Sequence, residues 1–121
     1  SEIAREFYFD RKHYFYPDLP KAYQISQFDL PVMHDGSIDL DVPGEAEPVT
    51  IRIERLHLEE DAAKLMHESK NSLVDFNKSG VPLIEVVTTP CIRNIKDAAT
   101  YAQYLQRIVQ NLKISEVIQF S

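Results

Sequence analysis

Only one stretch of this chain has the periodicity of a long helix. Residues 94–112 predict this helix, because apolar residues recur there three or four positions apart. The apolar stripe consists of Ile95, Ala98, Ala102, Leu105, Val109 and Leu112. Asn94 is a suitable N-cap, and Asp97 stands where a capping box has its acid. Lys113 stands where a helix-ending glycine is usual, at a cost of about 1 kcal/mol if it is left-handed.

The rest of the chain divides into short apolar or alternating segments separated by turn residues. We expect strands at residues 7–9, 14–16, 23–27, 30–33, 37–42, 49–59, 72–76 and 82–88. His34, Asp35 and Gly36 predict a hairpin turn, and the charged residues 10–13 predict a turn or a functional loop. Together these segments predict an α+β fold, an antiparallel meander sheet with one long C-terminal helix, in a single domain over residues 1–121.

Composition excludes several classes of protein. No apolar run approaches the roughly 20 residues of a membrane span, and no signal-peptide pattern opens the sequence. The single cysteine, Cys91, excludes an internal disulfide framework and a cysteine-cluster zinc site. The net charge of −6 argues against this chain alone binding the phosphate backbone of a nucleic acid. The three glycines are far apart, which excludes a phosphate-binding glycine loop. From the missing start methionine and the abrupt ends, we expect a fragment.

Residues 51–64 carry the densest set of candidate catalytic groups. In an extended chain Ile51 and Ile53 share one face, whereas Leu56 and Leu58 have the opposite parity. We therefore expect a phase slip between the two pairs, such as a β-bulge, which would return all four apolar side chains to one face.

After such a slip at residues 54–55, Arg55, His57 and Glu59 would point together, away from the core. Glu60 would point inward, where an unpaired carboxylate is costly. An acid in that position usually has a cation, a metal ion or a raised pKa. This stretch is therefore the first place where we expect chemistry.

Neighbouring carboxylates with a histidine suit Mg²⁺, which takes one or two protein carboxylates and substrate phosphates. Arg55 and Lys64 could offset charge that develops on a transferred phosphoryl group. The alternative is a solvated, charged strand end without chemistry. Glu85 shares a strand face with apolar residues, so it is either a paired interior acid or, as we favour, a residue at the edge of a sheet.

Three long blocks of the sequence resemble one known family. They are FDRKHYFYPDLPKAYQISQ at residues 9–27, RLHLEEDAAKLMH at 55–67 and SLVDFNKSGVPLIEVVTTP at 72–90. Their order and spacing are similar to those of the B subunit of aspartyl/glutamyl-tRNA amidotransferase. The resemblance extends from about Ile3 to Ser115.

The resemblance implies a glutamine-synthetase-like cradle domain that uses ATP and Mg²⁺. This subunit would phosphorylate the carboxylate of mischarged Glu-tRNA(Gln) or Asp-tRNA(Asn). Ammonia released by an amidase A subunit would then displace phosphate, and a small C subunit would complete the assembly. The implied location is the bacterial cytoplasm, or an organellar matrix or stroma.

The resemblance also assigns roles to individual residues. It places a Mg²⁺ ligand at Glu60, with Glu59 beside it, and it places Lys12 at the exit of an ammonia channel, where a lysine could handle the ammonia proton. The implied substrate- or channel-lining residues are Arg11, Tyr16, Asp18, Gln24, Gln27, Asp61 and Lys64. The chain departs from the family pattern at His13, Ala63 and Cys91, where Asn, Gly and Asp are usual. A further acid of the Mg²⁺ site would follow Ser115, and residues 116–121 do not match that block.

Two other hypotheses remain open. The chain could be a non-catalytic assembly module whose aromatic surfaces dock an amidase subunit. It could also be a metal hydrolase using His57, Glu59 and His67, although no regular ligand spacing links these residues. Under the family hypothesis, we expect the isolated fragment to be catalytically inert.

Overall fold

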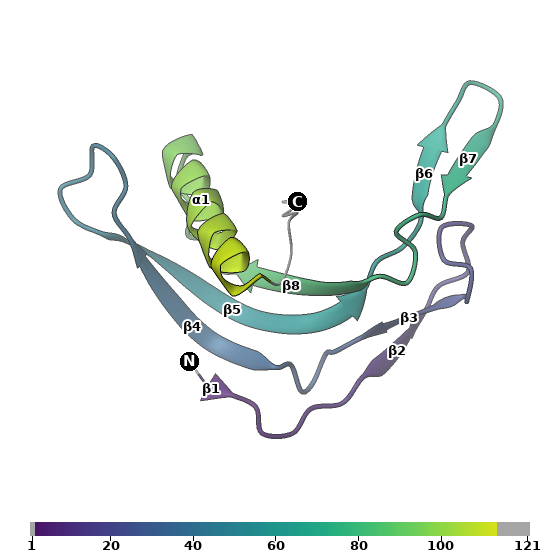
Figure 1. The fold of residues 1–121 in the computed structure, drawn as a ribbon, viewed down its shortest axis with the longest axis horizontal. Helices are drawn as coiled ribbons and strands as arrows, with labels where there is room; N and C mark the ends of the chain where they lie inside the picture. The colour runs from purple at the N-terminus through teal and green to yellow at the C-terminus, as the bar shows by residue number, and fades with distance from the viewer. Residues whose placement is uncertain (1, 114–121) are drawn as a thin grey trace. The chain divides into compact units, whose positions relative to one another are not determined.

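The computed structural model describes residues 2–113, which form eight strands and one helix (Figure 1). The strands are β1 (Glu2–Ile3), β2 (Asp10–His13), β3 (Tyr23–Ser26), β4 (Met33–Leu40), β5 (Val49–Glu60), β6 (Lys64–His67), β7 (Ser72–Asp75) and β8 (Pro82–Thr88); the helix is α1 (Ile95–Leu112). Antiparallel pairing with one C-terminal helix confirms the predicted α+β class. Within residues 2–113, no helix is both long and apolar enough to cross a membrane.

The largest sheet has four strands in the order β1-β4-β5-β8, so it follows the order of the chain. Two hairpins interrupt that order as separate two-stranded ladders, β2–β3 and β6–β7 (Figure 1). β8 lies at an edge of the large sheet, which agrees with the favoured placement of Glu85. The chain divides into two compact units, Ser1–Gly36 with Ile53–Val87, and Ser37–Arg52 with Thr88–Ser121.

The core of the second unit lies between strand residues and the middle of α1. Its buried members are Leu40, Val42, Ile51 and Tyr101, and Ile38, Val49, Cys91 and Leu105 pack against them. The predicted stripe is only partly correct: Ala102, Leu105 and Val109 are partly buried, whereas Ala98 is exposed and Ile95 and Leu112 are 86% and 63% exposed. The buried apolar side chain of α1 is Tyr101, which the stripe did not include. The small core covers only the central turns of the helix.

The predicted ends of α1 are confirmed. The Asn94 side chain accepts a hydrogen bond from the Asp97 backbone N–H at 3.0 Å, as an N-cap does. The Asp97 carboxylate reaches back one residue further than in a capping box and accepts from the backbone N–H of Arg93. Lys113 ends the helix in the left-handed conformation, with φ 53°.

Two local predictions in the first unit are wrong. Residues 10–13 form β2 rather than a turn, because β3 offers them a complete ladder from Asp10↔Ser26 to His13↔Tyr23. The aromatic runs 7–9 and 14–16 lie outside the strands. Their high β-propensity is overridden because no partner strand pairs with them.

The predicted hairpin turn at residues 34–36 is also wrong, because these residues lie inside β4. Pairing with β1 holds Met33 and His34 in the sheet, and Asp35 adopts a positive φ of 53° within the strand. By contrast, the strands at 49–59 and 82–88 are confirmed, with β5 extending to Glu60.

β5 shows no phase slip in its burial pattern, so that prediction is wrong as well. Ile51, Ile53 and His57 lie on one face of the strand and are all buried. Leu56 and Leu58 lie on the other face and are only partly buried. Arg55, His57 and Glu59 do point to one face, as predicted, but they continue the face of the buried isoleucines. The chemistry-bearing side chains therefore lie on the more buried face of the strand.

Candidate functional site

The neighbouring acids Glu59 and Glu60 have separate surroundings within the first unit. Successive side chains of a strand point to opposite faces. The Glu59 carboxylate meets His57, whereas the Glu60 carboxylate meets Lys21 and β3. The acids predicted to share a metal site therefore belong to two distinct groups of contacts.

The first group consists of His57, Glu59 and Glu85, whose candidate ligand atoms lie within 4.8 Å of one another. β5 supplies His57 and Glu59 two positions apart on one face, and β8 supplies Glu85. The His57 Nε2 atom lies 3.3 Å from the Glu59 carboxylate and 3.9 Å from that of Glu85. Their side chains range from largely buried for His57 to half-exposed for Glu85, so the cluster is open on one side.

Electrostatics makes this cluster receptive to a cation. Burial raises the pKa of Glu59, and the neighbouring Glu85 raises it further by repulsion and by a hydrogen bond. Contact with His57 opposes this rise but does not cancel it. Two carboxylates that disfavour each other's charge would be relieved by a divalent ion, and oxygen ligands of this kind suit Mg²⁺.

Arg55 fixes the role of His57 in the cluster. The Arg55 Nε–H donates to His57 Nδ1 at 3.1 Å, so the neutral imidazole carries its proton on Nε2. That Nε2–H faces the carboxylates of Glu59 and Glu85. In this tautomer, His57 orients the acids by donating to them, and the two carboxylates are the groups free to hold an ion.

The second group surrounds Glu60. Its carboxylate accepts from Lys21 Nζ at 2.6 Å and from the backbone N–H of Ile25 at 3.0 Å. The hydrogen bond from Lys21 is the main cause of the lowered pKa of Glu60, and Ile25 adds to it against the effect of burial. The cation expected for an inward-pointing acid is therefore Lys21, which sequence reasoning missed because it lies 39 positions away.

Two predicted lining residues connect β3 to the end of β5. Gln27 is buried; its Oε1 accepts from the Leu58 N–H at 2.9 Å, and its Nε2 donates to the Tyr8 carbonyl. The Gln24 side-chain amide donates to the backbone carbonyl of Glu60. Both glutamines thus hold the strand that carries the acids, and Gln24 lies beside Glu60.

β2 places Lys12 and Arg11 on opposite faces of its hairpin. Lys12 is exposed and lies opposite Gln24 in the ladder, and its side chain makes no hydrogen bond or ion pair within residues 2–113. Arg11 is exposed, and its guanidinium lies 5.1 Å from the centre of the Tyr23 ring.

The four remaining predicted residues do not converge on either acid group. Tyr16 stacks on Tyr14, with ring centroids 5.7 Å apart. The Asp18 carbonyl accepts from Ala63 N–H at 2.7 Å, and its buried Oδ1 has no hydrogen-bond partner in the described part of the chain. Lys64 is exposed on β6, opposite Asp75.

Asp61 acts mainly through its backbone. It donates to the Val81 carbonyl at 2.9 Å and accepts from Gly80 N–H at 2.8 Å, while its side chain binds the adjacent Ala62 N–H. Asp61 therefore ties the end of β5 to the segment that leads into β8.

The ligand set expected for a metal hydrolase is not assembled. His67 lies beside the Ser72 hydroxyl at 3.1 Å, at the hairpin β6–β7, and is not part of the cluster around His57 and Glu59. Glu85 takes the third position instead. Its alternation with apolar residues on β8 was the one sequence signal that pointed to it.

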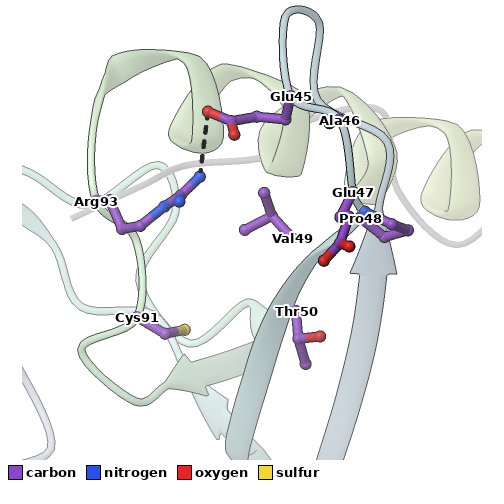
Figure 2. A pocket seen from close by; sticks show the side chains of 8 residues that line it. All are labelled: Glu45, Ala46, Glu47, Pro48, Val49, Thr50, Cys91 and Arg93. Carbon is purple, nitrogen blue, oxygen red and sulfur yellow. Dashed lines mark ion pairs between the residues drawn. The ribbon is translucent and has the colours of Figure 1, made fainter.

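The second unit contains an open hollow of about 470 Å³ that includes none of the predicted site residues (Figure 2). Its lining residues are Glu45, Ala46, Glu47, Pro48, Val49, Thr50, Cys91 and Arg93. Figure 2 shows Arg93 reaching toward Glu45, at 3.6 Å, and the same guanidinium lies 2.8 Å from Asp97. Arg93 thus forms ion pairs with two acids at the N-terminus of α1, which indicates a structural role.

Comparison with known proteins identifies relatives along nearly the whole chain. Residues 1–118 match the family described as the GatB/GatE catalytic domain. The chain is 55% identical over 118 residues to the B subunit of the aspartyl/glutamyl-tRNA(Asn/Gln) amidotransferase of Brevibacillus brevis. It is 54% identical over 116 residues to the protein of the same name from Staphylococcus aureus. Each match covers 96% of this chain and 24% of the relative, so the chain spans about a quarter of the length of these relatives.

Proposed function

Since the chain belongs to the GatB/GatE catalytic domain family, we propose that it forms part of the acyl-activating site of a tRNA-dependent amidotransferase. The substrates are mischarged Glu-tRNA(Gln) or Asp-tRNA(Asn), whose carboxylate is phosphorylated from ATP and then amidated by ammonia. An amidase A subunit supplies the ammonia, and a small C subunit belongs to the assembly. The proposed location is the bacterial cytoplasm, or an organellar matrix or stroma.

The observation that carries this proposal is the pairing of Glu59 with Glu85 beside His57. The donor set fits Mg²⁺, because two carboxylates from adjacent strands offer oxygen ligands on one open face. Glu59 and Glu85 would hold the ion, and His57 would orient them. When bound, Mg²⁺ would draw the phosphates of ATP and the substrate carboxylate together and stabilise the charge that develops between them.

Other residues of the chain complete the proposal. Glu60, predicted as the principal metal ligand, is held by Lys21 and Ile25 and would reach an ion only by leaving Lys21. Lys12 lies exposed on β2, where, only as the neutral amine, it could receive the proton that ammonia loses when it attacks the acyl group. Lys64 could offset phosphate charge from β6.

Binding of Mn²⁺ as a spectroscopic substitute for Mg²⁺ tests the ion site. We expect the 121-residue chain to bind one Mn²⁺ that Mg²⁺ displaces, measured by electron paramagnetic resonance of the free ion. Glu59→Gln and Glu85→Gln should each weaken binding at least tenfold, because each removes one of two charged ligands. Glu68→Gln, an exposed acid of the same unit, is the matched control and should bind as the unmodified chain does.

The absence of saturable Mn²⁺ binding at millimolar concentration would contradict the ion site, as would equal affinity in all three variants. The reaction itself is tested in an assembled amidotransferase that contains this segment. There, Glu85→Gln should reduce ATP-dependent formation of Gln-tRNA or Asn-tRNA while glutamine hydrolysis by the A subunit continues.

The hairpin β6–β7 favours a second candidate function, docking of a partner subunit. Met66 and Leu73 are 39% and 46% exposed, and Phe76 directly after the hairpin is 52% exposed. If ATP with Mg²⁺ leaves the backbone resonances of Glu59 and Glu60 unchanged while an amidase subunit binds, this assembly role replaces the catalytic one.

A further inference from the structure

The hairpin β2–β3 carries a cluster of cationic and aromatic side chains that the ion site does not use. In the antiparallel ladder, Arg11 pairs with Ile25 and His13 pairs with Tyr23, so these residues share one face of the hairpin. We call Arg11, His13, Lys21 and Tyr23 the Tyr23 cluster.

The Tyr23 ring is the centre of this cluster. The Arg11 guanidinium lies 5.1 Å and Lys21 Nζ lies 4.7 Å from the centre of the ring, and the His13 ring centroid lies 6.3 Å away. Arg11, His13 and Lys21 are exposed, and Tyr23 is partly exposed. The face therefore offers two aromatic rings and two cations to a ligand.

The two cations differ in how far their charge is compensated. Lys21 forms an ion pair with Glu60 at 2.6 Å. Arg11 forms no ion pair within residues 2–113 and rests only on the Tyr23 ring. On a chain with a net charge of −6, an uncompensated guanidinium held against an aromatic ring is a local attraction for an anion.

Rings interleaved with cations are the arrangement that binds single-stranded nucleic acid, in which bases stack on the rings and phosphates meet the cations. We propose that the Tyr23 cluster binds the unpaired terminal nucleotides of the acylated tRNA. A base stacks on Tyr23 or His13, and Arg11 contacts a backbone phosphate. This inference rests on the proposed function, because it assigns the RNA end of that substrate to a surface of this chain.

The charge of the chain restricts the occupant to a short single strand. A duplex presents a dense row of phosphates that a net charge of −6 would repel. A few unpaired nucleotides need only one or two cations, because stacking supplies a large part of their affinity. The Tyr23 cluster matches the smaller ligand.

Fluorescence anisotropy with a labelled eight-nucleotide RNA ending in CCA tests the inference on the 121-residue chain. Arg11→Gln should weaken binding about fivefold and should reduce the slope of log affinity against log salt by about 0.7, the value for one phosphate contact on a single strand. Tyr23→Leu should weaken binding about tenfold through lost stacking. Tyr23→Phe should bind like the unmodified chain, because it keeps the ring.

Arg107→Gln and Tyr104→Leu on α1 are matched controls, since both residues are exposed and of the same types. They should leave the affinity unchanged. Circular dichroism checks that each variant is folded. If Tyr23→Leu does not fold, the RNA affinity of Arg11→Gln alone tests the inference.

Three results would overturn the inference. The first is that the RNA shows no saturable binding up to 1 mM protein. The second is that the cluster variants and the control variants lose RNA affinity to the same extent. The third is that ATP displaces the RNA and that Arg11→Gln weakens ATP binding as much as RNA binding. Mn²⁺ binding is measured on the same samples. If Mn²⁺ binds and the RNA does not, only this inference fails and the proposed function stands.

Discussion

At the residue scale, environment rather than residue type decides the chemistry of the acids. Glu59 and Glu60 are adjacent, yet burial and Glu85 raise the pKa of one, whereas Lys21 lowers the pKa of the other. Strand alternation is the cause, because it turns the two side chains toward different neighbours. Glu60, whose charge Lys21 compensates, binds the backbone of β3. Glu59, which faces Glu85, is the acid suited to a cation.

Ala22 gives a residue-scale prediction about strain. It has a φ of 63°, in the left-handed region where a Cβ atom costs roughly 1–2 kcal/mol. Ala22→Gly should therefore raise the free energy of unfolding by about 0.5 kcal/mol, after the greater chain entropy of glycine is deducted. Urea denaturation measures this change.

Ala98→Gly is the matched control, because Ala98 lies in the helix α1, where glycine is unfavourable. It should lower the free energy of unfolding by about 1 kcal/mol. If both variants destabilise the chain to the same extent, Ala22 is not strained.

At the scale of elements, pairing and capping decide where each segment ends. β2 forms from charged residues because β3 completes its ladder, and β4 runs through a turn-like sequence because β1 holds it. α1 begins where Asn94 and Asp97 close the first turn. Local propensity predicts such boundaries well only where the capping groups are also local.

The start of α1 gives a prediction about pH. The hydrogen bond from Arg93 is the main cause of the lowered pKa of Asp97. A lowered folded-state pKa means that this carboxylate stabilises the fold above its unfolded pKa, near 3.8, and that the contribution is lost as pH falls through the folded value. Asp97→Asn should thus lower the melting temperature clearly at pH 7 and much less near pH 2.5.

Thermal melts over this pH range, followed by circular dichroism, give the comparison. Glu54→Gln changes an exposed strand acid and should show no such pH-dependent difference from the unmodified chain. If the difference in melting temperature between Asp97→Asn and the unmodified chain stays constant down to pH 2.5, the charge of Asp97 does not stabilise the helix.

At the scale of the whole molecule, the chain carries one set of candidate ligands within its described residues and spans about a quarter of the length of its relatives. Two carboxylates oriented by a histidine could hold an ion, but gathering ATP and an acylated tRNA requires more contacts. We therefore predict that the 121-residue chain alone does not amidate mischarged tRNA. The amidated product is measured by digesting the tRNA with nuclease and separating the labelled terminal aminoacyl-adenosine monophosphate by thin-layer chromatography. Any ATP-dependent amidated product would refute the prediction.

Sequence alone was sufficient to predict the α+β class, α1 with both its ends, the long strand β5, and the family to which the chain belongs. These features depend on contacts between near neighbours or on long stretches of identical residues. Folding in three dimensions was needed to show that β2 is a strand, that Glu59 meets Glu85, and that Lys21 neutralises Glu60. Each of these depends on residues at least ten positions apart, brought together by strand pairing that no local pattern records.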